Sequence, residues 1–255
     1  MNDFSEDGIL GGRLMLHQPK RGHRFGHDAI LLAAACPARR GDHALDLGAG
    51  VGAAGLALAK RVAGISVTLV EIDPQLSALA RANADRNGFS ASIRTVALDV
   101  TGSRRAFAKA ELVPGSAMHV LMNPPFHDEI SHQASPDPER ARAHIGSSTT
   151  LAAWVTTAAW MLRPRGTLTL MWRADGLLDA LSTLAKAFGG TAVLPVHGKP
   201  GRSAIRILVR AIKGSRAPLE LMPGLVLNNT AGRPAPEAQA VLRDGAALAL
   251  ARMDL

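Results

Sequence analysis

The sequence predicts an α/β protein with a doubly wound, mostly parallel sheet that ends in an antiparallel hairpin. Between residue 42 and about residue 210, short β-branched runs alternate with helical stretches rich in alanine and leucine. Strands that are separated by helices pair in parallel through right-handed crossovers. The last two predicted strands, Ala192–Val196 and Ser203–Val209, have no helical pattern between them. We therefore expect them to form an antiparallel hairpin on the edge of the sheet.

Local signals predict the individual elements. The helix Pro74–Asn87 has proline at its first position and Gly88 just beyond its end, the usual start and stop signals. The other predicted helices are Ala29–Cys36, Ala53–Val62, Leu151–Leu162 and Leu177–Phe188, and the other predicted strands are His43–Leu47, Ile65–Glu71, Ala91–Leu98, Met118–Met122 and Thr167–Met171. In the last strand, Ile205, Ile207 and Val209 alternate with Arg206 and Arg210, which predicts one buried face and one solvated face.

We expect a single domain with two flanking segments. Residues 42–213 form the alternating core, preceded by residues 1–41 and followed by residues 214–255. The last segment is rich in proline and is expected to be a loosely packed extension with a short helix near Glu237–Leu248. The polar stretch Asp128–Gly146 is expected to be a long mobile loop, because unstructured stretches of that length in compact domains are usually functional or disordered.

The composition indicates an ordinary globular protein with a basic surface. Hydrophobic residues make up 47% of the 255 residues and charged residues 20%. No apolar run is long enough for a membrane helix, and the acidic first residues do not resemble a signal peptide, so we expect a cytoplasmic protein. The single cysteine excludes an internal disulfide. The net charge of +8 favours a polyanionic partner such as nucleic acid, although a basic surface also serves solubility alone.

A glycine-rich turn between the first core strand and its helix is the first candidate site. Gly48, Gly50 and Gly52 let the backbone turn tightly and let a ligand approach main-chain N–H groups. Glu71 ends the next strand, where its carboxylate can accept hydrogen bonds from ribose hydroxyls. The pattern predicts a nucleoside across the carboxyl ends of two strands. The alternative is that the glycines only pack strand against helix.

The identity of this nucleoside depends on Asp46 and on the glycine spacing. Gly48, Gly50 and Ala53 also fit the dinucleotide pattern G-x-G-x-x-G/A, so an NAD-dependent oxidoreductase is one hypothesis. Asp46, however, places an anion at the turn, which would repel a pyrophosphate and suits the ammonium group of a methionine moiety. The D-x-G-x-G-x-G spacing resembles the S-adenosylmethionine-binding turn of Rossmann-like methyltransferases.

The sequence Asn123-Pro124-Pro125-Phe126 follows the fourth core strand, beside the proposed cofactor. An exocyclic amine is a poor nucleophile because its lone pair is delocalised. The Asn123 side-chain oxygen and the Pro124 carbonyl can each accept one amino hydrogen and direct the lone pair toward a methyl group. The two prolines hold these acceptors rigidly, and Phe126 offers a face on which a base can stack. The alternative is a simple proline turn after a strand.

These motifs resemble those of the amino-methyltransferases, and most closely those of the bacterial tRNA(Val) adenine-N6 methyltransferase family. The resemblance includes the segment from Gln18 to Ala33, which is similar to the family's N-terminal signature and would lie over the bound cofactor. It implies that Phe25 and Asp28 are further cofactor-site residues, and that Asp99 lies near the adenine. Asp28 and Asp99 could otherwise be helix caps.

The resemblance implies an S-adenosylmethionine-dependent enzyme that methylates an exocyclic amino group of RNA, with adenine N6 in tRNA as the first hypothesis. The run Asn-Pro-Pro-Phe-His also resembles ribosomal RNA guanine-N2 methyltransferases. Release-factor glutamine-N5 methyltransferases are further relatives, but they carry an N-terminal helical domain for which the segment before the turn leaves little room. A non-catalytic protein that binds an adenosyl ligand is an alternative of a different class. The oligomeric state stays open.

The remaining polar and aromatic residues lead to simpler interpretations. Two basic runs could follow an RNA backbone, although such runs are usually solvated faces; they are Lys20, Arg21, His23 and Arg24, and Lys199, Arg202, Arg206 and Arg210. The histidine spacings around His27 and His127 do not predict a metal site, so we expect none. Trp154 and Trp160 are expected to pack a helix against the sheet, and Cys36 to be buried.

Overall fold

The computed structural model describes residues 4–20, 24–125 and 138–252, with residues 138–149 described as backbone only. Its strands are β1 Phe4–Ile9, β2 Leu14–Pro19, β3 His43–Leu47, β4 Ser66–Glu71, β5 Ile93–Ala97, β6 Ala117–Met122, β7 Leu162–Arg173, β8 Phe188–His197, β9 Ala204–Lys213, β10 Glu220–Leu221 and β11 Leu225–Val226. Its helices are α1 His27–Ala35, α2 Ala53–Arg61, α3 Pro74–Arg86, α4 Arg104–Lys109, α5 Pro138–Met161, the 3-10 turn Ala174–Gly176, α6 Leu177–Leu184, α7 Pro236–Leu242 and α8 Ala249–Arg252. Among these helices, none is long and apolar enough to cross a membrane.

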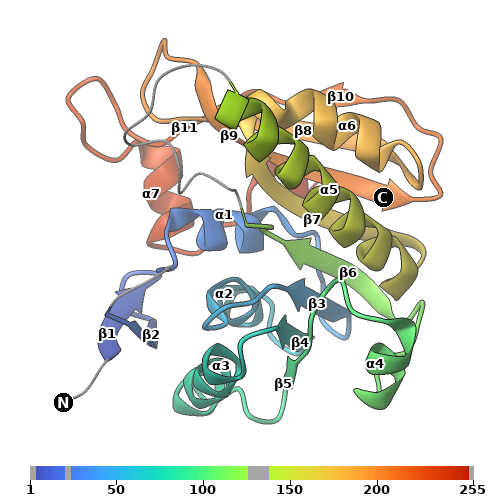
Figure 1. Cartoon of the computed structure of the whole chain (residues 1–255). Coiled ribbons are helices and arrows are strands. Elements are labelled where there is room, and N and C mark those ends of the chain that lie inside the picture. Colours follow the sequence, from blue (N-terminus) through green and yellow to red (C-terminus); the bar gives the residue numbers. More distant parts are fainter. Residues whose placement is uncertain (1–3, 21–23, 126–137, 253–255) are drawn as a thin grey trace.

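The predicted doubly wound sheet is confirmed. The strand order is β10-β8-β9-β7-β6-β3-β4-β5, with β11 also pairing with β8 (Figure 1). The pairs on either side of β3, β4 and β6 are parallel, whereas β9 pairs antiparallel with both β7 and β8. The predicted hairpin therefore exists, but its expected place at the edge is wrong. Strand β9 is inserted between β7 and β8, and the short strands β10 and β11 cover the outer side of β8.

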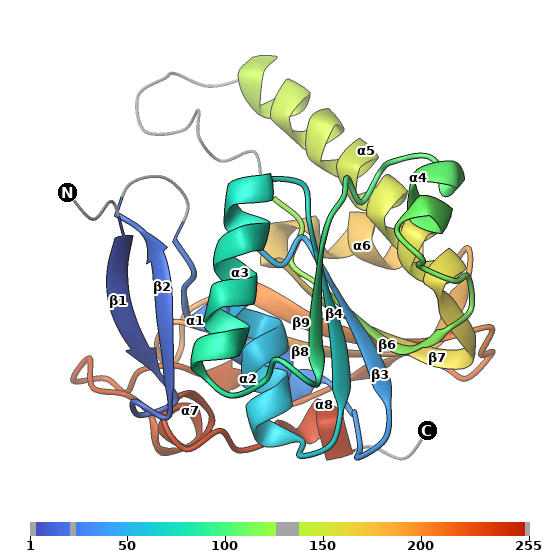
Figure 2. The same ribbon diagram turned by 90° about the horizontal axis from the view of Figure 1, so that it is seen from below.

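Helices cover both faces of the sheet (Figure 2). Helices α1, α2 and α3 pack on one face in a core that includes Leu31, Leu56 and Leu69. Helices α4, α5 and α6 pack on the other face, around Phe107 and Trp172. The central strands β3, β4 and β6 are buried on both faces, so most of their residues are apolar and they do not alternate regularly with polar ones.

An N-terminal hairpin of β1 and β2 was not among the predicted elements. It docks beside α3, where two asparagines one helical turn apart take the place of a neighbouring strand (Figure 2). The amide of Asn83 bonds the N–H and C=O of His17 at 2.8 and 3.0 Å, and Asn87 bonds both groups of Met15 at 3.0 and 2.8 Å. Asn83 also donates to the carbonyl of Val51 at 3.0 Å, which ties the hairpin to the glycine-rich turn.

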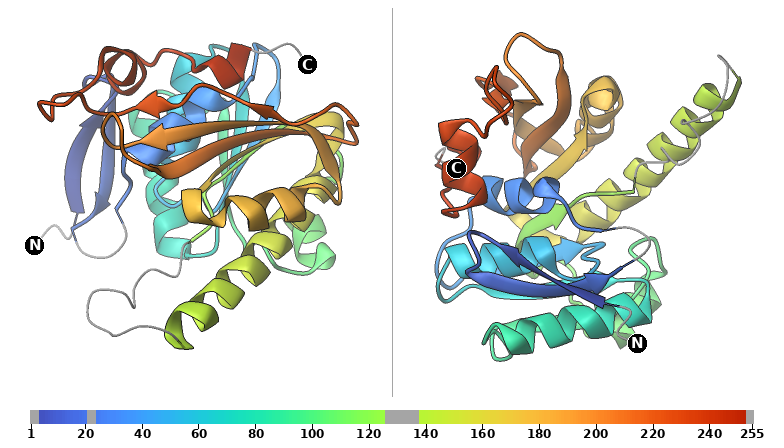
Figure 3. Two further views of the ribbon diagram at one scale, coloured as in Figure 1. Left: turned by 90° about the horizontal axis from the view of Figure 1, so that it is seen from above. Right: turned by 90° about the vertical axis from the view of Figure 1, so that its left-hand side faces the viewer.

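The C-terminal segment differs from the loosely packed extension that the sequence predicts. It adds β10 and β11 to the sheet and lays α7 and α8 against α1 (Figure 3). Leu225, Leu248 and Leu250 are buried. The single helix expected near Glu237–Leu248 is instead two short helices, and Gly245, with a φ of +67°, lies between them.

This packing also overturns the predicted solvated face of β9. Arg210 is only 2% exposed, and its guanidinium donates to the carbonyl of Leu250 at 3.0 Å. The alternation of arginine and apolar residues is present in the sequence, but α8 covers Arg210, whereas Arg206 is partly exposed and pairs with Asp28. A local sequence pattern cannot show that a distant segment of the chain packs over the strand.

The segment after the acceptor motif is helical earlier than expected. Helix α5 starts at Pro138, so residues 138–146 of the predicted mobile loop are helix (Figure 3). The rest of that predicted loop, residues 128–137, lies outside the described residues.

We predict that Leu250→Ala lowers the free energy of unfolding by about 2–3 kcal/mol, because it empties a fully buried site. Leu221→Ala on β10 is the matched control, since that side chain is 66% exposed. Urea denaturation measures both variants. Equal, small effects of the two substitutions would contradict the packed C-terminal segment.

Candidate cofactor and acceptor site

The register of the sheet brings three predicted site residues to one edge. Leu47, the last residue of β3, lies opposite Val70 of β4 and Met122 of β6. Gly48 directly follows Leu47, Glu71 follows Val70, and Asn123 follows Met122. The glycine-rich turn therefore lies between Glu71 and the acceptor motif, at the carboxyl ends of neighbouring parallel strands. Open α/β sheets bind their ligands at this edge.

The three glycines of the turn all have positive φ, at +70° for Gly48, +56° for Gly50 and +87° for Gly52. A Cβ at Gly48 would lie 2.3 Å from the ring of Trp154, and one at Gly52 would lie 2.9 Å from Leu69. A Cβ at Gly50 would meet no atom within 4 Å. Gly48 and Gly52 are thus required for packing, whereas Gly50 faces open space that a ligand can occupy.

Glu71 holds the turn in place. It is 7% exposed, and one carboxylate oxygen accepts the N–H of Gly50 at 2.7 Å while the other accepts the N–H of Asp73 at 3.0 Å. A carboxylate offers about four acceptor positions, so two are left for a ligand such as a ribose.

Asp46 lies deeper than its predicted role requires. It is 2% exposed, and its Oδ2 accepts the N–H of Gly55, in the first turn of α2, at 2.8 Å. Burial raises the pKa of this carboxyl from 3.8 to about 7; the Gly55 hydrogen bond opposes the rise and the negative charge of Glu71 adds to it. Asp46 therefore organises the turn from below, and a cation bound above it would favour its charged form.

This raised pKa predicts a dependence of stability on pH. Between pH 3.8 and about 7 the folded protein keeps a proton on Asp46 that the unfolded chain has released. The free energy of unfolding should therefore fall as the pH rises through this window. In Asp46→Asn the fall should be smaller, so the variant should gain stability relative to the wild type between about pH 4 and pH 7.

Urea denaturation at several pH values measures this effect. Asp85→Asn, at an exposed position of α3, is the control and should follow the wild-type pH dependence. If Asp46→Asn also followed the wild-type curve, the buried carboxyl would not be the titrating group.

The acceptor motif presents an amide oxygen with no partner. The side-chain oxygen of Asn123 is buried and has no hydrogen-bond partner among the described residues. Pro124 is buried and Pro125 is exposed, while Phe126 lies outside the described residues. Leaving such a group unpaired costs about 1–3 kcal/mol, so the position suits a ligand that donates a hydrogen bond.

Helix α5 contacts two loops of the site, which sequence reasoning did not anticipate. Trp154 packs its ring over Gly48, and the hydroxyl of Thr157 donates to the carbonyl of Val100 at 2.8 Å. The neighbouring Asp99 accepts the N–H and the hydroxyl of Thr101, both at 2.8 Å, as expected for a residue that caps a turn. The prediction that Trp154 packs is confirmed; Trp160 packs edge-on against Phe107.

The residues assigned through the N-terminal signature make other contacts in the structure. Asp28 pairs with Arg206 of β9 at 3.1 Å. Phe25 is half-buried and lines a pocket to which no residue of the glycine-rich turn, nor Glu71, Asp99 or Asn123, contributes. A role of Phe25 and Asp28 in cofactor binding therefore stays a prediction.

The basic runs are split by the fold. Lys20, Arg24, Lys199 and Arg202 are exposed, Arg206 is paired and Arg210 is buried, while Arg21 and His23 lie outside the described residues. Cys36 is buried, as predicted, and burial raises the pKa of its thiol to about 11. Within the described part of the chain, no cluster of three metal-ligating side chains occurs.

Comparison with known proteins identifies the family. The profile of the methyltransferase small domain matches residues 24–199. The chain belongs to this family. Membership decides against the NAD-dependent oxidoreductase that the glycine spacing left open, and the matched range includes the glycine-rich turn, Glu71, Asp99 and Asn123.

Relatives of this chain carry several specific names. The chain is 33% identical over 161 residues, 61% of each chain, to the tRNA1(Val) (adenine(37)-N6)-methyltransferase of Porphyromonas gingivalis. It is 29% identical over 164 residues to a release factor glutamine methyltransferase of Chlorobaculum tepidum, covering 62% of this chain and 54% of the relative. The chain thus spans less than two thirds of the length of these relatives.

A solved structure matches over a longer range. A predicted O-methyltransferase from Agrobacterium tumefaciens is 32% identical and superposes with a TM-score of 0.73, covering 87% of this chain and 98% of that one. The three names agree on methyl transfer and differ in the acceptor atom.

Proposed function

We propose that this chain is an S-adenosylmethionine-dependent methyltransferase that acts on the N6 amino group of adenine in tRNA. The observation that supports this most is the buried, unpartnered side-chain oxygen of Asn123 at the carboxyl edge of the sheet. An amino group supplies the donor that this oxygen lacks.

The glycine-rich turn and its acidic neighbour fit the methyl donor. The open space at Gly50 accepts the ligand, and the free acceptor positions of Glu71 suit ribose hydroxyls. Asp46 lies beneath the turn, where the ammonium group of a ligand would favour the charged form of this carboxyl. When bound, S-adenosylmethionine supplies a methyl group on a positively charged sulfur.

The chain's own contribution to the reaction is positioning. Asn123 accepts one hydrogen of the substrate amine, and the carbonyl of Pro124 accepts the other, which concentrates the lone pair on the nitrogen. The nitrogen forms its bond to the methyl carbon as the carbon–sulfur bond breaks, and it then releases a proton to water. No strong base is needed, because the methylated ammonium is acidic, so orientation and electrostatics suffice.

The choice of an RNA amine over other acceptors has independent support. The net charge of +8 favours a polyanion over a protein substrate. An oxygen acceptor would need a base to remove its proton, and an amide oxygen such as that of Asn123 is a very weak base. Relatives named as tRNA adenine-N6 methyltransferases make adenine the first choice over guanine N2 and glutamine N5.

Nucleoside mass spectrometry tests the proposal. Transfer RNA from a strain without the gene should lack one methylated nucleoside, N6-methyladenosine, and the wild-type gene should restore it. If the gene instead restored N2-methylguanosine, or methylglutamine in a release factor, the substrate would be guanine or glutamine and not adenine.

Calorimetry with purified protein separates catalysis from binding. We expect S-adenosylmethionine to bind and NAD not to bind. Binding of the donor without methylation of any RNA or protein would instead support the non-catalytic alternative.

A further inference from the structure

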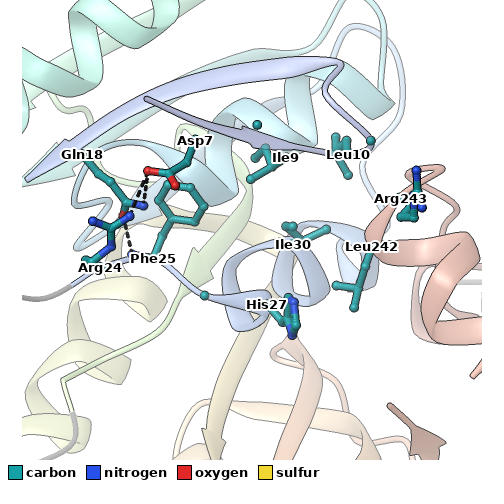
Figure 4. Close-up of a pocket in the computed structure, with 13 residues that line it drawn as sticks. Asp7, Ile9, Leu10, Gln18, Arg24, Phe25, His27, Ile30, Leu242 and Arg243 are labelled. Atoms are coloured by element: carbon teal, nitrogen blue, oxygen red, sulfur yellow. Dashed lines mark hydrogen bonds and ion pairs between the residues drawn. The ribbon is translucent and has the colours of Figure 1, made fainter. Parts of the chain in front are cut away.

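A pocket of about 610 Å³ lies between the N-terminal hairpin, the start of α1 and the end of α7 (Figure 4). Its walls come from residues 7–11 and 18, residues 24–27 with Ile30, and residues 242–243. It is therefore built by the two segments that flank the methyltransferase core. Ligand pockets commonly measure about 300–1,000 Å³, so this one can hold a group the size of a nucleotide.

One part of the wall is apolar. Ile9, Leu10 and Ile30 are buried in the core beneath the pocket, and Phe25 and Leu242 are half-buried beside them (Figure 4). Such a surface suits the flat, largely apolar face of a base. Phe25 adds an aromatic ring, and the stacking of a base on an aromatic side chain is worth about 1–3 kcal/mol.

The rim is positively charged. Arg24 and Arg243 line it and are exposed, and His27 lies between them in the lining (Figure 4). The carbonyl of Arg243 accepts a hydrogen bond from Arg13 at 2.8 Å, which anchors the backbone that carries this guanidinium. Among the described residues, no carboxylate pairs with the Arg243 side chain.

Asp7 is the one carboxylate among the lining residues, and it is already occupied. Its Oδ2 accepts hydrogen bonds from Gln18 at 2.8 Å and from Arg24 at 2.9 Å (Figure 4), and a third from Ser5 at 2.8 Å. Hydrogen bonds from Gln18 and Ser5, with the Arg24 charge, hold the pKa of Asp7 below its usual value. Asp7 therefore orders the rim, and its charge is compensated within the pocket wall.

From these features we infer that the pocket binds a second nucleotide of the RNA substrate, distinct from the one that is methylated. The base lies against the apolar wall and Phe25, and its phosphate is held by Arg243. This inference rests on the proposed function. An RNA strand that leaves the pocket past His27 would next meet the Asp28–Arg206 pair. Beyond this pair lies the loop between β8 and β9, where Lys199 and Arg202 are exposed.

The RNA-binding test uses Arg243→Ala and Arg243→Glu, with Arg105→Ala and Arg105→Glu on α4 as matched controls. Both arginines are exposed, and α4 lies on the far side of the molecule from α7 (Figure 1). Fluorescence anisotropy with labelled tRNA from the deletion strain gives the affinity at several salt concentrations. Losing one phosphate contact should reduce the slope of log K against log salt by about 0.7 for a single strand.

We expect the Arg243 variants to bind tRNA more weakly with a shallower salt slope, and the Arg105 variants to match the wild type. Adenosine monophosphate should bind the wild type only weakly, since the pocket acts on a nucleotide within a chain. The KM for tRNA should rise in Arg243→Ala while kcat is unchanged.

Equal affinities and slopes for the Arg243 and Arg105 variants would overturn the second-nucleotide site. Tight binding of the free nucleotide that Arg243→Ala abolishes would also overturn it, in favour of a small-molecule site. Neither result affects the nucleoside that the enzyme methylates. Conversely, a wild-type protein that binds tRNA through Arg243 but methylates no adenine would overturn the proposed function and leave the site standing.

Discussion

Replacing Asn123 with alanine is expected to lower kcat for methyl transfer by about 10²- to 10³-fold, the usual effect of removing one group that stabilises developing charge. The amide oxygen of Asn123 is buried and unpartnered among the described residues, so its hydrogen bond is available to the substrate. Alanine removes this acceptor, and the amine then keeps its delocalised lone pair. The affinity for S-adenosylmethionine should stay near the wild-type value, because Glu71 and the glycine-rich turn are unchanged.

Stability gives a second, independent readout for this variant. Removing a buried acceptor that has no partner should not destabilise the protein. We expect the free energy of unfolding, measured by urea denaturation, to rise by about 1 kcal/mol. Lost activity with retained stability is the signature of a residue kept for function.

Asn123→Asp is the matched control, because a carboxylate keeps an oxygen acceptor at the same place. We expect this variant to retain more activity than the alanine variant in a single-turnover assay with tRNA and labelled donor. Wild-type rates in Asn123→Ala would show that another group positions the amine.

Alanine at Gly48 and alanine at Gly50 are expected to fail in different ways. At Gly48 the added carbon would lie 2.3 Å from the Trp154 ring, at a φ of +70°. Backbone strain of about 1–2 kcal/mol and overpacking of about 1–3 kcal/mol together predict a loss of roughly 2–5 kcal/mol in stability. At Gly50 the added carbon meets nothing within 4 Å, so only the backbone strain applies.

The cofactor affinities should show the opposite contrast. A side chain at Gly50 occupies the open space assigned to the ligand, so we expect at least a tenfold loss of affinity for S-adenosylmethionine, or about 1.4 kcal/mol. Urea denaturation and calorimetry on both variants provide the comparison. Normal donor affinity in a folded Gly50→Ala variant would exclude this space as the cofactor site.

The alternating core could be predicted because its signals are local. Strand β3 has the predicted bounds, and α3 ends within one residue of the prediction, since proline and glycine mark its two ends. The glycines, Glu71 and Asn123 could be grouped for a related reason: parallel strands end at one edge, so residues that follow them in the sequence meet in space.

The missed features depend on segments that are far apart in the chain. The hairpin β1–β2 is held by Asn83 and Asn87, more than sixty residues away, and its own sequence has little strand pattern. Arg210 was expected to be solvated because its strand alternates, yet Leu250 accepts its hydrogen bond. The Asp28–Arg206 pair spans 178 residues.

The α/β class, the order of the core elements and the edge of the sheet at which chemistry is expected all follow from local sequence patterns. Each of these follows from periodicity and turn residues within a few positions. Only the packing of distant segments shows that Gly48 lies under Trp154 while Gly50 faces open space, and that the two flanking segments form a pocket. Backbone conformation depends mainly on neighbouring residues in the sequence. The burial of a residue and the free volume around it depend on which distant side chains pack against it.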